Sequence, residues 1–228
     1  MPEKLGNGGN SLEKYNPEDG KYIADGKPNK YYDNPAEKQK KYRPQLTQMY
    51  GETALKQIQE DINVDEESAK YYQNAFYQYT GGNSALIKSG DDFDVYYIED
   101  YINKAPVYDG EIYRGLRFFD NDEKAKNFVK QLQKGSVIDM GGISSWTSSQ
   151  SVARLYSGGI NNDDYAYKIM FILKNNKSGV GIQHLSLYGS EEEVLQSSKT
   201  KFKIFDIEIN TLNHWKQGKE YKVYVDEV

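Results

Sequence analysis

The sequence predicts an α+β domain, with helices in its first half and strands in its second. Apolar residues recur every three or four positions from Leu46 to Ile102, which is the period of a helix. From Glu111 onward the period changes to two, which is the period of a strand, and the apolar segments become short. Helices that precede strands, rather than alternate with them, indicate an α+β fold and not a chain of βαβ units.

The helices of the first half have recognisable ends. Pro44 suits a first helical turn, and Gly81-Gly82 is expected to end the second helix. Pro106 closes the last helix of this half. Tyrosines in the stripes of these helices are expected to be core residues. The expected helices cover residues 44–62, 65–79, 84–87 and 91–104.

The second half alternates short strands with two helices. The first helix is capped at Asp120 or Asn121 and ends at Gly135, and the second begins at Ser149. The Gly- and Asn-rich residues 158–164 predict an irregular loop. The expected strands cover residues 111–118, 137–140, 143–147, 165–173, 180–185, 192–196, 202–209 and 220–226.

Composition excludes several classes of function. The chain has 228 residues, a length that fits one domain with an extension. Its net charge of −5 gives no attraction to nucleic acid or anionic lipid, so neither is expected as a partner. Cysteine is absent, which excludes disulfides, thiolate nucleophiles and cysteine-bound metals. With only two histidines, a histidine-rich metal site is not expected, and no metal is predicted.

The first 40 residues differ from the rest of the chain. Residues 1–40 are rich in Gly, Asn, Pro, Asp and Lys without an apolar period, which predicts a flexible extension; an ordered arm wrapped on the domain is the alternative. Residues 41–228 form the expected folded domain. The N-terminus lacks the apolar core of a signal peptide and no run approaches a membrane span, so a soluble protein is expected. Nothing in the sequence indicates an oligomer, so a monomer is expected.

The acidic stretch that follows Tyr188-Gly189-Ser190 is the first candidate for chemistry. It leads into an apolar pair that begins an expected strand. Glu191 and Glu193 are two positions apart, so on a strand both point to one face with Cα atoms about 6.5 Å apart. Because glutamate is depleted in strands, two on one face suggest a functional site. The alternative is an acidic, solvated loop.

Arg114 is the second candidate. It lies within an expected strand, between Tyr113 and Gly115. A guanidinium beside a glycine can form a bidentate anion site, because the glycine allows a ligand to approach the backbone. The alternative is an arginine on a solvated strand face.

The stretch Ser144-Ser145-Trp146-Thr147-Ser148, which is rich in hydroxyl residues, lies shortly after Gly141-Gly142. Hydroxyls at alternate strand positions can hydrogen-bond a carboxylate on the same face. The alternative is turn chemistry and helix capping. His184 and His214 are expected to pack or to face water, and neither lies near a nucleophile motif.

The order of these three stretches resembles that of mono-ADP-ribosyltransferases of the Arg-Ser-Glu (R-S-E) class. This class includes the enzymatic components of bacterial binary toxins and phage-encoded transferases. The resemblance covers residues 45–228 and has one departure, because Trp146 occupies the central position of the family's Ser-Thr-Ser motif. The matching stretches are Tyr79-Thr80-Gly81-Gly82, Ile112-Tyr113-Arg114-Gly115, Gly142 to Ser148, and Tyr188-x-x-Glu191-x-Glu193-Val194-Leu195.

The resemblance implies an ADP-ribosyltransferase-like fold, in which two roughly perpendicular β-sheets form an NAD cleft beside N-terminal helices. Residues 41–228 would be the catalytic domain, with NAD as its substrate. Arg114 would hold the NAD pyrophosphate, and the backbone at Gly115 would meet the nicotinamide amide. Ser145 would orient Glu193, which would contact the ribose and stabilise the positive charge that develops as the nicotinamide leaves.

The resemblance also implies how the acceptor is bound. Glu191 would engage the guanidinium of an arginine on a target protein and help to remove its proton. Tyr188 would contact that protein substrate. The loop 156–164 would cover the phosphates and nicotinamide, and Arg154 is a candidate for a second phosphate contact.

Three other functions stay open from the sequence. Hydrolysis of NAD would use the same site with water as the acceptor. Paired carboxylates also occur in glycoside hydrolases, and a catalytically inactive phage structural module is the non-enzymatic reading. The transferase reading implies a phage effector or bacterial toxin that acts in the cytoplasm of a target or host cell, after delivery with a phage particle or a toxin partner.

Overall fold

A computed structural model describes residues 15–16, 21–22, 52–90, 92, 94–116, 118, 122–158, 167–212 and 218–228. Within the expected N-terminal extension, β1 (Tyr15–Asn16) and β2 (Lys21–Tyr22) pair antiparallel. The rest of residues 1–40 lies outside the described residues, so the boundary at residue 40 stays a prediction. The expected helix start near Pro44 also lies outside them.

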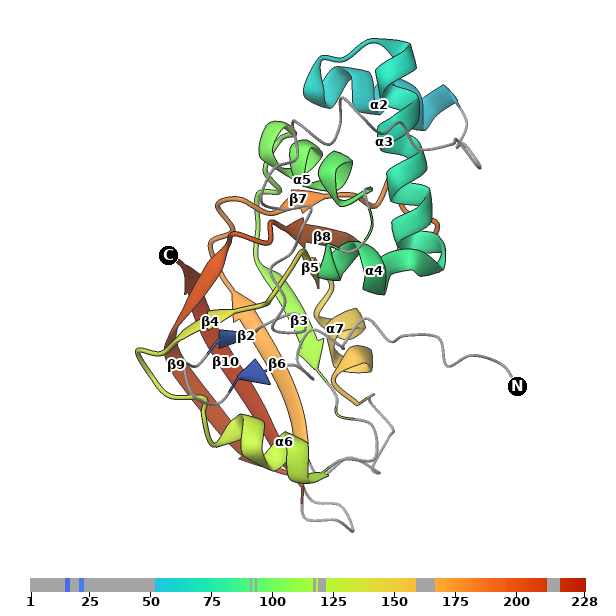
Figure 1. Ribbon diagram of the computed structural model, residues 1–228. Helices are drawn as coiled ribbons and strands as arrows, with labels where there is room; N and C mark the ends of the chain where they lie inside the picture. Colours follow the sequence, from blue (N-terminus) through green and yellow to red (C-terminus); the bar gives the residue numbers. More distant parts are fainter. Residues whose placement is uncertain are drawn as a thin grey trace, which may run out of the picture.

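Helices gather at one end of the molecule, as the sequence predicts (Figure 1). Asp65 caps one of them, because its side chain accepts a hydrogen bond from the Ser68 backbone N–H at 2.7 Å. The rings of Phe76 and Tyr101 meet edge to face, with centroids 5.0 Å apart, in the core between the helices. The helices are α2 (Glu52–Ile62), α3 (Glu66–Gln78), α4 (Ser84–Ser89) and α5 (Val95–Lys104).

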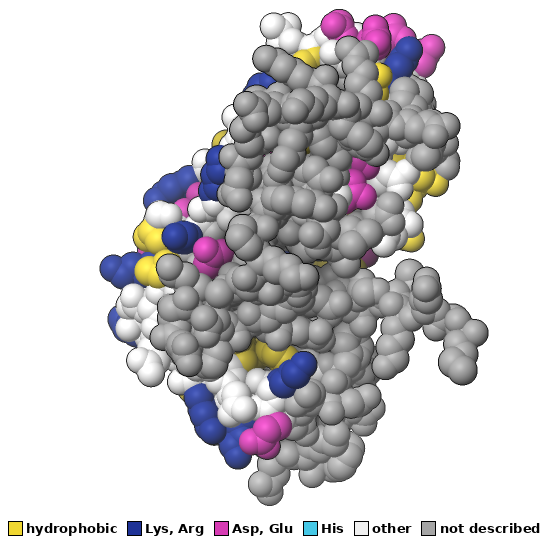
Figure 2. Space-filling view, in the orientation of Figure 1, with side chains coloured by type: hydrophobic (Ala, Val, Ile, Leu, Met, Phe, Trp, Pro, Cys, Tyr) yellow, Lys and Arg dark blue, Asp and Glu magenta, His cyan; other side chains and the backbone are white. Residues whose placement is uncertain are grey.

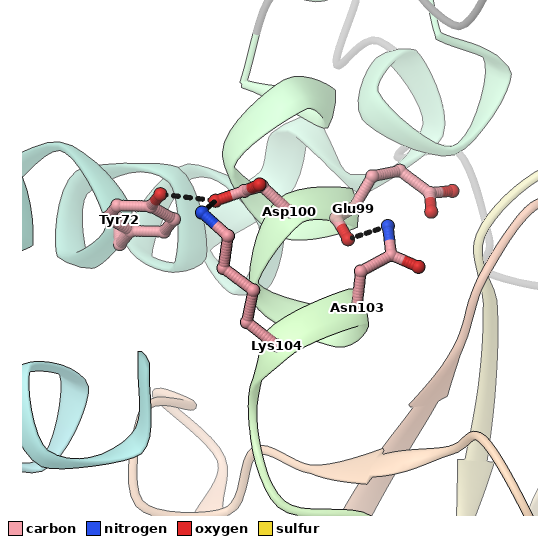
Figure 3. Close-up of polar contacts among 5 residues, drawn as sticks. All are labelled: Tyr72, Glu99, Asp100, Asn103 and Lys104. Carbon is pink, nitrogen blue, oxygen red and sulfur yellow. Dashed lines mark hydrogen bonds and ion pairs between the residues drawn. The ribbon is translucent and has the colours of Figure 1, made fainter. Parts of the chain in front are cut away.

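Polar contacts reinforce the packing of α5 against α3 (Figure 3). Tyr72 of α3 donates to Asp100 Oδ2 at 2.5 Å, and Lys104 Nζ lies 2.7 Å from the same oxygen. Within α5, Asn103 Nδ2 donates to the backbone oxygen of Glu99 at 2.7 Å. The two helices are therefore joined at their polar edge as well as through their apolar faces.

The expected helix end at Gly81-Gly82 is confirmed, because α3 ends at Gln78 and α4 begins at Ser84. The short segment Tyr79–Asn83 joins the two helices across a kink. Gly82 adopts φ = 133°, which glycine reaches without steric cost, and this non-helical residue redirects the chain into α4. The kink separates α3 from α4 at the point where the helices meet the sheet.

In the part of the chain that the structure describes, eight strands form one sheet in the order β4-β9-β10-β6-β3-β5-β8-β7. The pair β6–β10 is parallel, and the other neighbours are antiparallel. The strands are β3 (Ile112–Leu116), β4 (Val137–Asp139), β5 (Ser144–Thr147), β6 (Tyr167–Leu173), β7 (Val180–Gly181), β8 (Glu193–Gln196), β9 (Lys201–Thr211) and β10 (Lys219–Glu227). The α+β class is confirmed.

The sheet has two parts that meet at a single residue pair. Strands β3 and β5 pair only through Tyr113 and Thr147, whereas β3 and β6 pair at five positions. The two sheets that the resemblance implies are thus the two parts of one continuous hydrogen-bonded sheet. In Figure 1, β7 and β8 run across the direction of β6 and β10. Past Tyr113, β3 is free to diverge from β5, and the candidate site residues lie at this junction.

Some elements differ in length from the expectation. Strand β7 ends at Gly181, because Ile182 begins a turn in which its carbonyl accepts from the N–H groups of Leu185 and Ser186 at 2.8 and 2.9 Å. Ile182 and Leu185 are both buried, so apolar residues predicted for a strand pack as a turn. Two further helices, α6 (Asp122–Val129) and α7 (Gln150–Tyr156), lie among the strands, and α6 ends before the predicted Lys134.

Two main hydrophobic cores lie on the sheet. One joins α6 to the larger part of the sheet and includes Trp146, Phe171 and Phe202, and the other joins the N-terminal helices to β5, β7 and β8. On the face shown in Figure 2, acidic side chains gather at the end formed by α2 and α3, and basic ones lie along the side of β4 and β9. Among the helices that the structure describes, none combines the length and hydrophobicity that a bilayer span requires.

Candidate active site

Glu193 is a buried carboxylate at the start of β8. It pairs with Thr147 of β5, and only 8% of it is exposed. Tyr79 Oη donates to Glu193 Oε1 at 3.2 Å, and the Ser145 hydroxyl lies 2.5 Å from Tyr79 Oη and beside the same carboxyl group, whose pKa it lowers. The structure thus brings Ser145 next to Glu193, and the role of Ser145 in orienting Glu193 stays a prediction. Two hydroxyls linked by a hydrogen bond lie against the buried carboxylate.

Tyr79 is the site residue that the sequence analysis placed in the core. Its ring is buried, as expected, but its hydroxyl lies 2.5 Å from Ser145 Oγ and faces Glu193. Burial and the Glu193 charge raise the pKa of Tyr79, so it acts as a neutral donor. Tyr79 directly follows α3 with helical backbone angles, just before the kink at Gly82. The signal in the sequence was the stretch Tyr79 to Gly82, which belongs to the family resemblance.

Arg114 lies across the junction from Glu193. It projects from β3, is only 4% exposed, and donates through Nη1 to the backbone oxygen of Ser145. The predicted alternative of a solvated arginine is wrong, because the guanidinium is buried. The contact joins the two parts of the sheet just beyond their single residue pair. A buried guanidinium in this place is suited to an anionic ligand.

Gly115 is needed for the packing of α7. A Cβ atom on residue 115 would lie 1.9 Å from the carbonyl oxygen of Ala153 and 2.6 Å from the backbone nitrogen of Ser157. Any side chain would push α7 away from β3. The predicted contact between the Gly115 backbone and nicotinamide stays a prediction. Arg154, the candidate for a second phosphate contact, is an exposed residue of α7. Most of the predicted loop 156–164 lies outside the described residues, because the description stops at residue 158 and resumes at 167.

Trp146 points away from the site. Neighbouring side chains of a strand alternate between faces, so Ser145 faces Glu193 while Trp146 faces the core of the larger part of the sheet. Its indole is 2% exposed, lies 5.0 Å from the Phe202 ring, and donates through Nε1 to Ser144 Oγ at 3.0 Å. The departure from the family motif therefore changes the core and leaves the position of Ser145 intact.

Glu191 does not share a strand face with Glu193, so the expected geometry is wrong. Glu191 ends a 3₁₀ turn, Gly189–Glu191, and Glu192 follows in a left-handed conformation with φ = 48°. This conformation turns the chain before β8 begins. Thr147 Oγ1 donates to the Glu191 backbone oxygen at 2.7 Å and fixes the turn beside β5.

The Glu191 turn carries an exposed aromatic residue. Tyr188 precedes the turn and is 56% exposed, as a contact for a protein substrate requires. Ser148 fastens the other end of the turn, because its hydroxyl donates to Glu192 Oε2 at 2.5 Å and its N–H to the Glu192 oxygen at 3.1 Å. A carboxylate on a fixed turn thus lies between a buried carboxylate and an exposed aromatic ring.

Lys88 is a cation of the site that the sequence analysis missed. The end of α4 packs tightly against the residue pair ahead of β5, since a Cβ on Gly142 would lie 2.0 Å from the carbonyl oxygen of Lys88. The Lys88 ammonium lies 5.2 Å from the centroid of the Tyr79 ring. No sequence motif marks it, because its position depends on how α4 folds onto the sheet.

The charges of the site influence one another. Burial raises the pKa of Glu193, and the Glu191 carboxylate adds to this effect, whereas the Lys88 ammonium and the two hydroxyl donors oppose it. Burial lowers the pKa of Lys88 to about 8, against the opposing attraction of Glu193. Arg114 lowers the pKa of Lys88 further, because the two cations lie near each other. Two cations and two carboxylates therefore surround the junction.

The histidines lie elsewhere. His184 Nε2 lies 3.4 Å from Asp61 Oδ2 of α2 and 3.3 Å from Tyr101 Oη, so it packs in a polar contact of the helical end. Burial lowers the pKa of His184. This agrees with the expected packing role. His214 lies outside the described residues.

Comparison with known proteins supports the resemblance. No protein-family model matches the chain. Over 124 residues the sequence is 31% identical to the Vis protein of Vibrio splendidus, which is named as a candidate NAD(+)–arginine ADP-ribosyltransferase. The match covers 54% of this chain and 47% of that protein, so the matched part spans about half the length of the curated relative.

A solved structure shows the same fold. Plx2a, an ADP-ribosyltransferase toxin from Paenibacillus larvae, superposes with a TM-score of 0.52 at 18% identity, over 78% of this chain and 92% of that one. The Vis toxin of Vibrio splendidus gives a TM-score of 0.45 at 24% identity, over 78% and 74% of the two chains. The similarity to Plx2a confirms the predicted ADP-ribosyltransferase fold.

Proposed function

We propose that this chain, which has the ADP-ribosyltransferase fold, is an NAD-dependent mono-ADP-ribosyltransferase that modifies an arginine side chain of a target protein. The observation that carries the proposal is the arrangement around Glu193. A buried carboxylate, held by Ser145 and Tyr79, lies across from the buried guanidinium of Arg114, and Glu191 lies on the adjacent turn. Arg114, Ser145, Glu193 and Glu191 are residues that the family resemblance implies, and Tyr79 is added by the structure.

The residues of the site fit NAD as a substrate. The pyrophosphate of NAD is a dianion, and Arg114 offers a planar group of donors for it. The nearby Lys88 ammonium adds a second positive charge. The Ser145 hydroxyl and the Glu193 carboxylate are partners for ribose hydroxyls. Gly115 would then lie beside the nicotinamide.

The proposed reaction is a displacement at C1′ of the nicotinamide ribose. The bond from C1′ to the nicotinamide nitrogen breaks, and its electron pair leaves with nicotinamide. Positive charge develops on the ribose, and the Glu193 carboxylate stabilises it. Because Ser145 and Tyr79 already hold Glu193 in position, no reorganisation is needed as the charge forms.

Glu191 is proposed to serve the acceptor. A carboxylate pairs with a guanidinium through two parallel hydrogen bonds, so Glu191 would hold the arginine of the target protein near C1′. As a guanidinium nitrogen attacks C1′, its proton passes to Glu191. The exposed ring of Tyr188 would contact the protein that carries this arginine. This chemistry fits a phage effector or a bacterial toxin that acts in the cytoplasm of a target or host cell.

Replacing Lys88 with methionine is expected to move the acid side of the pH–rate profile to higher pH. The reaction requires ionised Glu193, whose pKa is already raised by burial and lowered by the Lys88 charge. Without the ammonium, the pKa of Glu193 rises further, so activity is lost earlier on acidification. Nicotinamide release measured across pH, with Lys56→Met on the exposed face of α2 as control, tests this. If the acid side of the pH–rate profile does not shift, Lys88 does not influence the ionisation of Glu193.

Replacing Glu191 with glutamine is expected to abolish transfer to arginine while NAD cleavage continues. Glutamine keeps the shape of the side chain but cannot take the guanidinium proton, whereas water can still capture the ribose. General-base groups contribute roughly 10²- to 10⁴-fold, so transfer should fall at least 100-fold. Transfer is measured as ADP-ribosyl-agmatine, and cleavage as nicotinamide released in the absence of agmatine.

Glu52→Gln is the matched control, because this exposed carboxylate of α2 undergoes the same chemical change far from the junction. It should leave both rates unchanged. If Glu191→Gln stops NAD cleavage and transfer together, the separate roles assigned to the two glutamates are wrong. If wild-type protein releases nicotinamide but never labels agmatine or protein, the site is that of an NAD glycohydrolase.

A further inference from the structure

Tyr156, the last residue of α7, contacts the carboxylate of Glu191. Its hydroxyl donates to Glu191 Oε1 at 2.6 Å, although 35 positions separate the two residues. The side chain is 44% exposed, so the contact lies at the surface of the site and not in the core. The sequence analysis placed Tyr156 at the start of the loop 156–164 and gave it no contact with Glu191, because the pairing arises only when α7 packs beside the Glu191 turn.

Both partners of this hydrogen bond are attached to rigid elements. Helix α7 is seated on β3 at Gly115, where no space remains for even a Cβ atom. On the other side, Thr147 holds the Glu191 backbone and Ser148 holds Glu192. The Tyr156 hydroxyl and the Glu191 carboxylate therefore meet between two fixed segments. The bond selects one position for a side chain that the turn itself leaves partly exposed.

The hydrogen bond does not prevent Glu191 from binding an acceptor. A carboxylate offers about four lone-pair sites on its two oxygens, and Tyr156 occupies one of them. The other oxygen and the remaining lone pair can accept a guanidinium.

We propose that Tyr156 is a positioning residue for ADP-ribose transfer, whose hydroxyl holds Glu191 in the orientation that receives the acceptor arginine. This inference rests on the proposed function and deepens it. Tyr156 acts through Glu191, so it serves the acceptor step and not the cleavage of NAD. The ring of Tyr156 is exposed and has space for other contacts, but the proposal concerns its hydroxyl.

The substitution Tyr156→Phe isolates the hydroxyl, because the ring and its packing remain. Transfer to agmatine and hydrolysis of NAD are measured separately under steady-state conditions. We expect kcat/KM for agmatine to fall about tenfold, chiefly through a higher KM, since a hydrogen bond to a charged group is lost. NAD hydrolysis without agmatine should stay within about twofold of the wild-type rate, because Tyr156 acts through Glu191 on the acceptor only. A general change in the fold would instead reduce both reactions.

Tyr224→Phe is the matched control. Tyr224 of β10 also donates its hydroxyl to a glutamate, Glu208, at 2.9 Å, but on an exposed part of β9 and β10. Its loss should leave both reactions unchanged. Unaltered transfer in Tyr156→Phe, or an equal loss of transfer and hydrolysis, would overturn the assignment of Tyr156 alone. Absence of transfer in the wild-type protein would overturn the proposed function and this inference with it.

Discussion

Replacing Glu193 with glutamine is expected to slow nicotinamide release roughly 10²- to 10³-fold, the loss typical for removal of one preorganised electrostatic group. Glutamine keeps the length of the side chain and can still accept hydrogen bonds from Tyr79 and Ser145. It lacks the negative charge that stabilises the developing positive charge on the ribose. The rate of nicotinamide release at saturating NAD measures the effect.

The same substitution should not reduce the stability of the fold. Burial raises the pKa of Glu193, which means that its charge is costly inside the protein, and a neutral amide relieves that cost. The midpoint of thermal unfolding for Glu193→Gln is therefore expected to equal or exceed that of the wild-type protein. This comparison separates loss of chemistry from loss of structure.

Glu99→Gln gives a matched control for Glu193→Gln. Glu99 is also a carboxylate that accepts from serine, with its oxygens 2.8 Å from Ser197 Oγ and 2.7 Å from the Ser198 nitrogen, but it belongs to α5. It should keep the wild-type rate of nicotinamide release. A Glu193→Gln protein that retains more than about a third of the wild-type rate would show that this carboxylate does not carry the reaction.

Replacing Trp146 with alanine is expected to lower the free energy of unfolding by about 3–5 kcal/mol. The indole is almost fully buried, packs against the rings of Phe171 and Phe202 with centroid distances of 6.5 and 5.0 Å, and leaves a large cavity when removed. Its N–H also donates a hydrogen bond to Ser144 Oγ. Denaturant unfolding at equilibrium measures the change.

The substitution Trp146→Phe tests whether Trp146 contributes to the stability of the core or to the binding of substrate. Phenylalanine fills part of the cavity and loses the hydrogen bond to Ser144, so a smaller loss of stability is expected than for alanine. The KM for NAD and the rate of nicotinamide release should both stay at wild-type values, because Trp146 faces away from Glu193. A raised KM with unchanged stability would mean that the indole contacts the substrate.

Much of the fold follows from periodicity. The helix over residues 95–104 and the strand at 112–116 lie within their predicted ranges, because each carries a regular apolar pattern whose exposed and buried faces match the observed burial. The strand alternation that places Ser145 and Trp146 on opposite faces was also available from the sequence. Applied to the motif, it assigns the unusual tryptophan to the core.

The Glu191 turn shows where local patterns are insufficient. Glu191 to Leu195 read as the start of a strand, but Glu192 adopts a left-handed conformation that few non-glycine residues take. This conformation is held by Ser148, which lies 44 positions earlier in the chain. A conformation that depends on so distant a partner cannot be predicted from neighbouring residues.

Tyr79, Lys88 and Tyr156 show the same limit for the site. Tyr79 was assigned to the core and Lys88 was passed over, because a tyrosine in a helical stripe and a lone lysine are ordinary features of a helix. Tyr156 was assigned to a loop over the NAD phosphates and not to a contact with Glu191. The kink at Gly82 and the close contact at Gly142 bring the first two to the sheet. Arg114, Ser145 and Glu193 were found because they belong to motifs with a recognisable order.

The most direct test of the account is product analysis after incubation of the protein with agmatine and NAD labelled in its ADP-ribose half. The account predicts that nicotinamide and ADP-ribosyl-agmatine form together, and that both disappear in Glu193→Gln. Free ADP-ribose as the sole labelled product would contradict transfer to arginine. Protein that neither binds nor cleaves NAD would contradict the assignment of the site as a whole.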